Sequence, residues 1–95
     1  MRIAIDYDDT YTNDPKLWSL FIELCRRRKH EVVIATMRSE KNPVEEKFNV
    51  PVYYTDCKAK APFLWSEGIK IDIWIDDSPW LVTEDFKGAR VYLEG

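Results

Sequence analysis

The chain has little of what disulfide-stapled and zinc-binding proteins depend on. Its 95 residues include only two cysteines and one histidine. Two cysteines without a further cluster of ligands do not make a zinc site. A disulfide between Cys25 and Cys57 stays open, although we expect a reduced chain in which Cys25 is a small core residue. The histidine, His30, is expected to lie in a loop.

Long apolar runs are missing as well. No window approaches the ~20 apolar residues of a membrane span. The first residues enter a predicted strand at once and lack the apolar segment of a signal peptide. There is no internal repeat and no low-complexity segment. We therefore expect a cytoplasmic protein that does not associate with a membrane.

The chain also lacks an excess of positive charge. The net charge is −3 and the isoelectric point is about 5.1, which gives no general attraction to nucleic acid. The basic run at residues 26–29 is a local exception. It has the composition of a nucleic-acid patch, but cations at a helix carboxyl end also complement the helix dipole, and we favour that explanation.

What the sequence does have is a regular alternation of strands and helices in one domain's length of chain. Asp14 and Pro15 are typical of a helix start, and apolar residues then recur at three- and four-residue spacing. Pro51 indicates an edge strand or a later strand start. Strands are predicted at 2–6, 32–36, 50–54, 71–75 and 89–93. Helices are predicted at 15–28, 43–48, from Pro62 until Gly68 ends it, and at 79–86.

The predicted strands are near-continuous apolar runs, as in parallel sheets covered on both faces. We therefore expect an α/β fold, a three-layer Rossmann-like sandwich with a five-stranded, mostly parallel sheet. A chain of this length leaves no material for a cap domain. Right-handed crossovers place the carboxyl end of every strand at one edge of the sheet, where ligands bind in such folds.

Acidic residues crowd the end of the first predicted strand. Asp6, Asp8 and Asp9 follow an apolar run, and Asp14 comes shortly after. Carboxylates this close repel one another, so burying one without compensation is costly. The stretch is either a solvated acidic turn or a site where the carboxylates hold a divalent cation.

Polar residues at the ends of other strands favour the cation site. Thr36 ends the second predicted strand and Asp76 ends the fourth, with Asp77 beside it. Lysines at positions 58 and 60 come just before a helix. A lone Asp-x-Asp is a weak signal, but Asp-x-Asp-x-Thr combined with these residues is much stronger, because the fold brings the strand ends to one edge.

The order of these motifs resembles the haloacid dehalogenase-like (HAD-like) superfamily of phosphohydrolases. The four motifs match residues 6–10, Thr36, Lys60 (with Lys58 as the alternative) and the pair Asp76-Asp77. The stretches 6–12 and 71–79 look most like small, uncapped members, many of them encoded by phages. The resemblance covers nearly the whole chain, so it implies a single hydrolase core domain over residues 1–95.

The resemblance implies a Mg²⁺-dependent phosphatase that acts on a phosphorylated substrate. Asp6 would be the nucleophile that forms an aspartyl-phosphate, and Asp8 the general acid and base. Residues i and i+2 of an extended chain share a side, so both can face one phosphate. Mg²⁺ would be held by Asp6, by the backbone carbonyl of Asp8, by Asp76, and by Asp77 directly or through water.

Three further residues have expected contacts with the phosphoryl group. Thr36 would donate a hydrogen bond to it, and Lys60 would neutralise its charge. Arg38 is a candidate for bidentate binding of a substrate phosphate, with plain surface exposure as the alternative. Thr10 is expected to fix the loop through side-chain bonds to the backbone.

Asp9 departs from the family pattern, since glycine is very common at its position. Aspartate tolerates unusual backbone angles better than most residues. The stretch from residue 7 to 14 is also too short for the usual flap, which suits an open site for a small or macromolecular phosphate.

Two other classes of function compete with the phosphatase. One is a non-catalytic relative that binds metal or phosphate as a regulatory or interaction module. Retention of Asp8 favours the enzyme, because metal binding needs only its backbone carbonyl. The other is a phosphoacceptor receiver domain, which places its phosphoacceptor on the third strand and its lysine after the fifth. This chain has no suitable lysine there.

Overall fold

The protein is built on a four-stranded parallel sheet in the order β3-β2-β1-β4. A computed structural model describes residues 1–87. The strands are β1 (Arg2–Asp6), β2 (Glu31–Thr36), β3 (Val52–Tyr54) and β4 (Ile73–Ile75). Two helices, α1 (Pro15–Arg27) and α2 (Lys60–Ser66), and two short 3₁₀ turns, η1 (Tyr11–Asn13) and η2 (Pro79–Val82), join them. The predicted fifth strand at 89–93 lies outside the described residues, as does Gly88.

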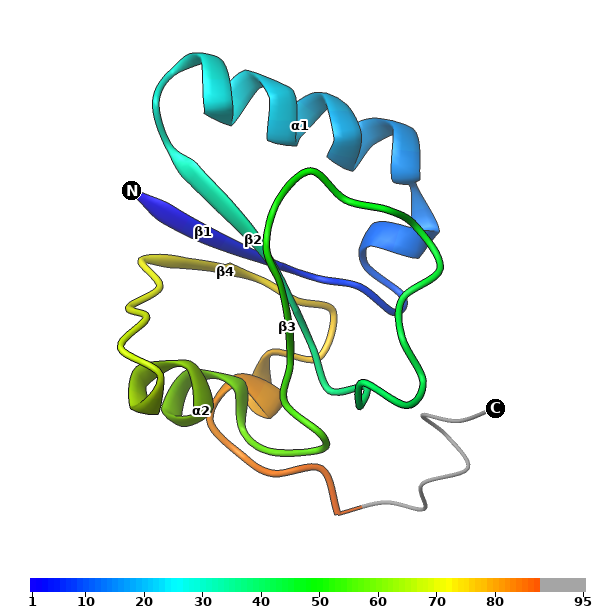
Figure 1. Ribbon diagram of the computed structural model, residues 1–95, viewed down its shortest axis with the longest axis vertical. Helices are drawn as coiled ribbons and strands as arrows, with labels where there is room; N and C mark the ends of the chain where they lie inside the picture. Colours follow the sequence, from blue (N-terminus) through cyan, green and yellow to red (C-terminus); the bar gives the residue numbers. More distant parts are fainter. Residues whose placement is uncertain (88–95) are drawn as a thin grey trace.

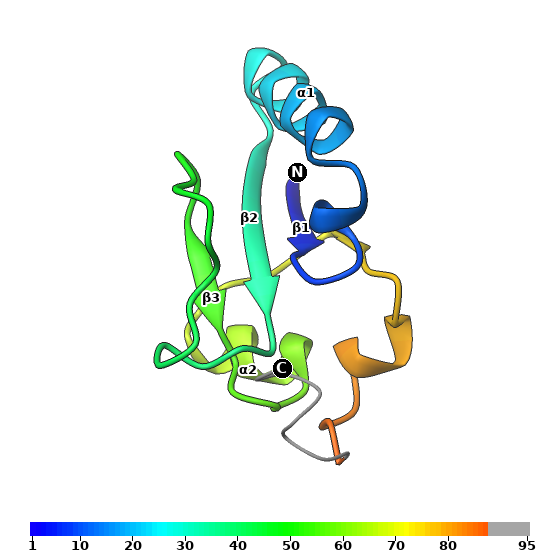
Figure 2. The same cartoon turned by 90° about the vertical axis from the view of Figure 1, so that its right-hand side faces the viewer.

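The sheet is covered on both faces, as the apolar strands predict. Figures 1 and 2 show α1 on one side of the strands and α2 on the other. Ile3 and Ile5 of β1 pack with Ile22 and Cys25 of α1. The alternate β1 residue, Ala4, packs with Leu64 of α2. The predicted α/β class and the parallel sheet are therefore confirmed, with four strands among the described residues.

The strand order places a reversal beside β1. The chain moves from β1 to β2 and on to β3, then returns to the other side of β1 for β4. Ile5 pairs with Ile34 of β2 and with Ile75 of β4, so the three strands end almost level. Asp6 and Asp76, one residue past these positions, lie beside the crevice that the reversal creates.

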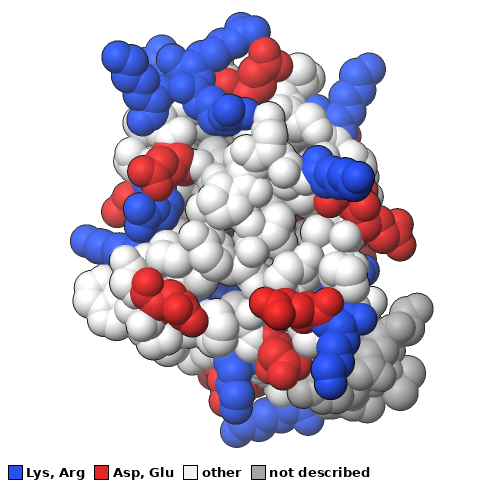
Figure 3. Space-filling view, viewed as in Figure 1, with Lys and Arg blue, Asp and Glu red and all other residues white. Residues whose placement is uncertain are grey.

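The predicted start of α1 is confirmed. The Asp14 carboxylate accepts the Leu17 N–H at 3.2 Å, and Pro15 is the first helical residue. The helix ends at Arg27, followed by Lys29 with a φ of 65°. Figure 3 shows basic side chains gathered at this end of the molecule. No helix in the described chain is long and apolar enough to cross a bilayer.

The helix predicted at 43–48 is wrong, because these residues form an irregular loop. Tertiary contacts replace the helical bonds. The Val44 N–H donates to the hydroxyl of Tyr54 at 3.2 Å, and the Glu45 N–H donates to that of Tyr7 at 3.3 Å. Val44 and Phe48 pack against the core on the α1 side of the sheet. Tertiary contacts thus override a weak local helix preference.

Other boundaries differ from prediction by a few residues. β3 is an edge strand that begins at Val52, so Pro51 precedes it. α2 begins at Lys60, before Pro62, which sits in the first turn, where a missing N–H breaks no helical bond. Gly68, with a φ of 78°, ends α2 as predicted.

The last two predicted elements are shorter than expected. β4 spans three residues rather than five, and η2 is a 3₁₀ turn that ends at Val82 instead of a helix to residue 86. Beyond it the chain turns back to the start of α2. The Asp85 carboxylate accepts the Ala59 N–H at 2.7 Å, and the Phe86 N–H donates to the Cys57 carbonyl at 2.8 Å. These bonds hold the segment beside the first turn of α2.

Candidate active site at the carboxyl edge of the sheet

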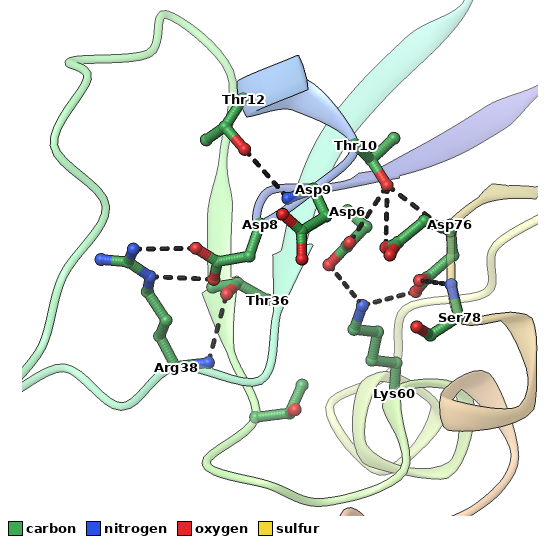
Figure 4. A network of polar contacts seen from close by, with 12 residues as sticks. Asp6, Asp8, Asp9, Thr10, Thr12, Thr36, Arg38, Lys60, Asp76 and Ser78 are labelled. Carbon is green, nitrogen blue, oxygen red and sulfur yellow. Dashed lines mark hydrogen bonds and ion pairs between the residues drawn. The ribbon is translucent and has the colours of Figure 1, made fainter. Parts of the chain in front are cut away.

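The site is built around Asp6, which is 8 % exposed at the end of the central strand β1. Lys60, the first residue of α2, reaches under the sheet edge to it. The Lys60 Nζ lies 2.7 Å from Asp6 Oδ1 and 2.5 Å from Asp76 Oδ2, as Figure 4 shows. The side chain of Lys60 is 3 % exposed, as is that of Asp76. One buried cation therefore joins the ends of β1 and β4.

The structure settles which lysine joins the site. Lys60 is 2 % exposed and bonded to two carboxylates. Lys58 is exposed, and its backbone carbonyl accepts the Thr55 hydroxyl at 2.9 Å. Lys58 follows two residues with positive φ, Asp56 and Cys57, and this turn sets the position from which α2 starts.

Burial changes the acidity of Asp6. Loss of hydration raises the pKa of the Asp6 carboxyl to about 7, Lys60 opposes this, and the neighbouring Asp76 adds to it. An ionised Asp6 is thus stabilised chiefly by Lys60. Any additional cation beside Asp6 favours the ionised form further.

Thr10 has a larger role than the loop contact predicted from the sequence. Its hydroxyl lies 3.1 Å from Asp6 Oδ2 and 3.2 Å from Asp77 Oδ1, and accepts the Asp77 N–H at 3.1 Å. A threonine hydroxyl has one proton, so it donates to one carboxylate at a time. The expected side-chain bond to the backbone is present, but it joins the loop after β1 to the end of β4.

Asp77 and Ser78 complete the end of β4. The Ser78 N–H donates to Asp76 Oδ1 at 2.9 Å, so each Asp76 oxygen has a partner. Asp77 is exposed and offers its carboxylate from the solvent side. Oxygen atoms of Asp6, Asp76 and Asp77 all lie within 4.8 Å of one another.

These three carboxylates fit a divalent cation. Oxygen ligands on opposite sides of a Mg²⁺ ion lie about 4.2 Å apart, twice a bond length of about 2.1 Å. The observed spacing therefore needs only small side-chain rotations to surround one ion. Asp6, Asp8, Asp76 and Asp77 place four carboxylates here, against the two cations Lys60 and Arg38. The carboxylates at this edge therefore outnumber its cations, which favours an additional cation there.

Asp8 is paired with Arg38, a contact that sequence reasoning did not identify. Arg38 Nε and Nη2 donate to the two Asp8 oxygens at 2.9 and 2.8 Å. A third guanidinium nitrogen donates to the Pro43 carbonyl at 2.9 Å, and the group lies 5.1 Å from the ring centre of Tyr7. Arg38 is therefore ordered at the site, not free at the surface.

Thr36 lies at the carboxyl end of β2, fully buried at 1 % exposure. Its hydroxyl accepts the Arg38 N–H at 3.1 Å, which leaves the hydroxyl proton available for a donor role. Figure 4 shows Thr36 beside Asp8 and Arg38, on the far side of Asp6 from Asp76. The predicted residues thus meet at one edge, with Thr36, Asp8 and Arg38 on one side and Lys60, Asp76 and Asp77 on the other.

Asp9 has a φ of 62°, a left-handed conformation in which glycine is favoured and aspartate is tolerated. The Asp9 N–H donates to the Thr12 hydroxyl at 2.9 Å, and its carbonyl accepts from the Asn13 amide at 2.7 Å. The positive φ of Asp9 explains why a glycine would suit this position in the loop. The hydrogen bonds of the Asp9 backbone with the side chains of Thr12 and Asn13, both in η1, hold an aspartate in this conformation.

The space between these groups is small. A cavity of about 30 Å³ is lined by Asp6, Asp8, Lys60, Asp76 and neighbouring residues, which is room for about one water molecule or ion. A phosphoryl group therefore needs side-chain movement at the mouth of the site, where Asp77 and Asp8 are the more exposed members.

Comparisons of the chain with protein family models, with curated proteins and with solved structures found no match. Fold and site together define a small parallel α/β protein with a lysine-bridged carboxylate cluster at the carboxyl edge of its sheet.

Proposed function

We propose that the protein is a Mg²⁺-dependent phosphatase of the HAD-like kind, an uncapped Rossmann-like core that hydrolyses phosphate monoesters. The observation that carries the proposal is the meeting of Asp6, Asp76, Asp77 and Lys60 at the strand reversal. Buried carboxylates with a raised pKa and specific charge partners are typical of functional sites. A cytoplasmic location stays a prediction.

In this proposal Asp6 attacks the phosphorus atom of the substrate. A bond forms between an Asp6 oxygen and phosphorus while the bond to the leaving oxygen breaks, and Asp8 gives that oxygen a proton. Water then attacks the phosphorus of the aspartyl-phosphate, Asp8 takes a proton from the water, and phosphate leaves. Asp6 returns to its starting state as the carboxylate.

The cationic side chains hold the phosphoryl group during these steps. Lys60 neutralises charge beside Asp6, and Thr36 donates its hydroxyl proton to a phosphoryl oxygen. Mg²⁺, bound by Asp6, Asp76, Asp77 and the Asp8 carbonyl, would reduce the repulsion between the anionic nucleophile and the anionic substrate. The close spacing of the three carboxylate oxygens supports this assignment of ligands.

Arg38 has to release Asp8 before Asp8 can give a proton to the leaving oxygen, because both Asp8 oxygens accept hydrogen bonds from the Arg38 guanidinium. A substrate phosphate offers Arg38 an equivalent bidentate partner. Substrate binding and release of Asp8 are therefore coupled in the proposal. The proposal therefore still includes the bidentate contact between Arg38 and the substrate phosphate that the sequence predicted.

The second candidate is a non-catalytic module that binds a metal ion or phosphate. Two observations favour it. Arg38 occupies both oxygens of Asp8, and the cavity of about 30 Å³ has room for about one water molecule or ion. Such a module would keep Asp6 and Asp76 for the ion and would not need a proton on Asp8.

Hydrolysis of a generic aryl phosphate, with Mg²⁺ and with chelator, separates the two candidates. We expect Mg²⁺-dependent turnover that Asp6→Asn abolishes, with Asp9→Asn as the matched control in the same loop. Turnover in Asp6→Asn equal to the wild type would exclude Asp6 as the nucleophile. Mg²⁺ binding by calorimetry without any turnover would favour the non-catalytic module.

A further inference from the structure

α1 carries a second apolar surface besides the one that packs on the sheet. Leu17, Leu20 and Leu24 are 51 %, 60 % and 56 % exposed, while Ile22 and Cys25 are buried. The three leucines are spaced by three and four residues, so they form one continuous stripe along the helix. Three half-exposed leucines in one stripe form a contiguous apolar patch rather than scattered apolar exposure.

The stripe lies on the β4 side of α1. The opposite flank of the helix, with Ser19, Glu23 and Arg26, faces the loop at 47–49 that leads to β3. Ile73 of β4 pairs with Ile3, so its side chain shares the sheet face that α1 covers, and it is 41 % exposed. Among residues 1–87 the sheet therefore leaves an exposed apolar residue at the edge on this side.

We propose that a second copy of this chain covers the stripe, with the two α1 helices antiparallel about a two-fold axis at Leu20. In that arrangement Leu20 meets its own symmetry mate, and Leu17 meets Leu24 of the other copy. Each leucine thus faces a leucine. Such self-complementarity is what a two-fold interface requires.

The charges beside the stripe match the same arrangement. Lys16 and Glu23 lie seven residues apart on the flank of the helix away from β4, and both are exposed. Glu23 also pairs with Arg27 of its own helix at 2.6 Å. A two-fold axis at Leu20 places Lys16 of each copy within one residue's rise, about 1.5 Å along the axis, of Glu23 in the other. Opposite charges therefore meet twice in the antiparallel arrangement, whereas a parallel two-fold pair would put the two Lys16–Glu23 flanks on opposite sides of the interface. The helix dipoles also oppose one another favourably.

The area involved sets the strength of the pairing. α1 has 13 residues and is about 20 Å long and about 10 Å wide, so the stripe is smaller than the ~800 Å² per partner of a stable interface. We expect a weak dimer that forms at about 100 µM and dissociates on dilution to about 1 µM. This surface is separate from the carboxylate cluster, so the proposal does not depend on the proposed activity.

Sedimentation velocity of the full chain between about 1 and 500 µM, at low ionic strength, tests the proposal. The wild type is expected to dimerise with increasing concentration. Leu20→Lys sets two lysines against each other at the axis and is expected to weaken dimerisation at least tenfold. Trp65→Lys removes an equally exposed apolar side chain, 67 % exposed on α2, and is expected to dimerise like the wild type.

A charge exchange tests the antiparallel register itself. Lys16→Glu and Glu23→Lys each create like-charge contacts in their own dimers, so each alone is expected to be more monomeric than the wild type. An equimolar mixture of the two restores both opposite-charge pairs and is expected to form heterodimers at least tenfold more tightly than either variant alone. Circular dichroism checks that each variant keeps its helix content.

Three results would overturn the proposal. They are a wild type that stays monomeric at about 500 µM, a dimer that Leu20→Lys and Trp65→Lys weaken equally, and a mixture of the charge variants that associates no better than its components. A monomer would leave the stripe to a different partner. If Leu20→Lys fails to fold, the mixture of charge variants still decides.

Discussion

Lys60 is the side chain whose removal should cost the folded protein most. Its Nζ bonds to Asp6 and Asp76 at 2.7 and 2.5 Å, and the side chains of Lys60, Asp6 and Asp76 are 3 %, 10 % and 3 % exposed. Solvent screening is therefore weak for this pair of contacts. Removing one member of a buried ion pair leaves an uncompensated charge and costs about 3–5 kcal/mol. We expect Lys60→Met to lower the free energy of unfolding by that amount in the absence of metal.

Lys58→Met is the matched control, because it removes an exposed lysine two residues away. Surface substitutions of this kind change stability by no more than about 0.5 kcal/mol. Urea unfolding in chelator, followed by circular dichroism, measures both. With a urea dependence of about 2 kcal/mol per molar, Lys60→Met moves the midpoint down by about 2 M. If Lys58→Met and Lys60→Met have the same midpoint, the lysine bridge contributes nothing and the reasoning fails.

The loss in Lys60→Met should also depend on pH. Without Lys60, the raised pKa of Asp6 rises further, since the lysine is the group that opposes the effect of burial. Below this pKa the buried Asp6 carboxyl is protonated and neutral, so it no longer needs the positive charge that the variant lacks. The destabilisation is therefore expected to be larger at pH 8.5 than at pH 5.5, and equal losses at the two values would contradict it.

Three further predictions concern the same edge of the sheet. In the metal-free wild type, the Asp6 pKa of about 7 lies above its ordinary value of 3.8. The contribution of Asp6 to stability is therefore fully present below about pH 4 and is lost as pH rises through 7. The urea midpoint of Asp6→Asn should lack this pH dependence. Mg²⁺ at a hundred times its dissociation constant should stabilise the wild type by about 2.7 kcal/mol; a thermal shift that Asp76→Asn retains in full would contradict the ligand assignment. Arg38→Lys loses bidentate binding, so its kcat/KM for an aryl phosphate should fall about tenfold, the equivalent of about 1.4 kcal/mol; an unchanged value would remove Arg38 from substrate binding.

The sequence predicted the centre of the fold better than its margins. β1 and β2 are continuous apolar runs buried on both faces, so their strand character and the parallel class of the sheet could be predicted from composition. Residues 43–48 were predicted as a helix because local pattern is all that a sequence displays there. Their conformation depends on the hydroxyls of Tyr7 and Tyr54, which arrive from distant parts of the chain.

The candidate site shows the same division. Asp6, Thr36 and Asp76 were predicted to meet because parallel strands bring their carboxyl ends together. The pairing of Asp8 with Arg38 was not predicted, because the two residues lie 30 positions apart and either could have faced solvent. The sharing of the Thr10 hydroxyl between Asp6 and Asp77 was missed for the same reason. A threonine directly after the acidic pair Asp8-Asp9 is the signal that was available.

The contacts of Lys60 with Asp6 and Asp76 make folding of the protein independent of metal binding. Where a bound ion is the only partner of a buried carboxylate cluster, the chain cannot fold until the ion is captured, and a chelator unfolds it. Here Lys60 supplies a positive charge that is covalently part of the chain, so the ends of β1 and β4 can close as soon as α2 forms. Folding is therefore expected not to depend on the divalent ion concentration, and the ion proposed to bind Asp6, Asp76 and Asp77 would be taken up after folding.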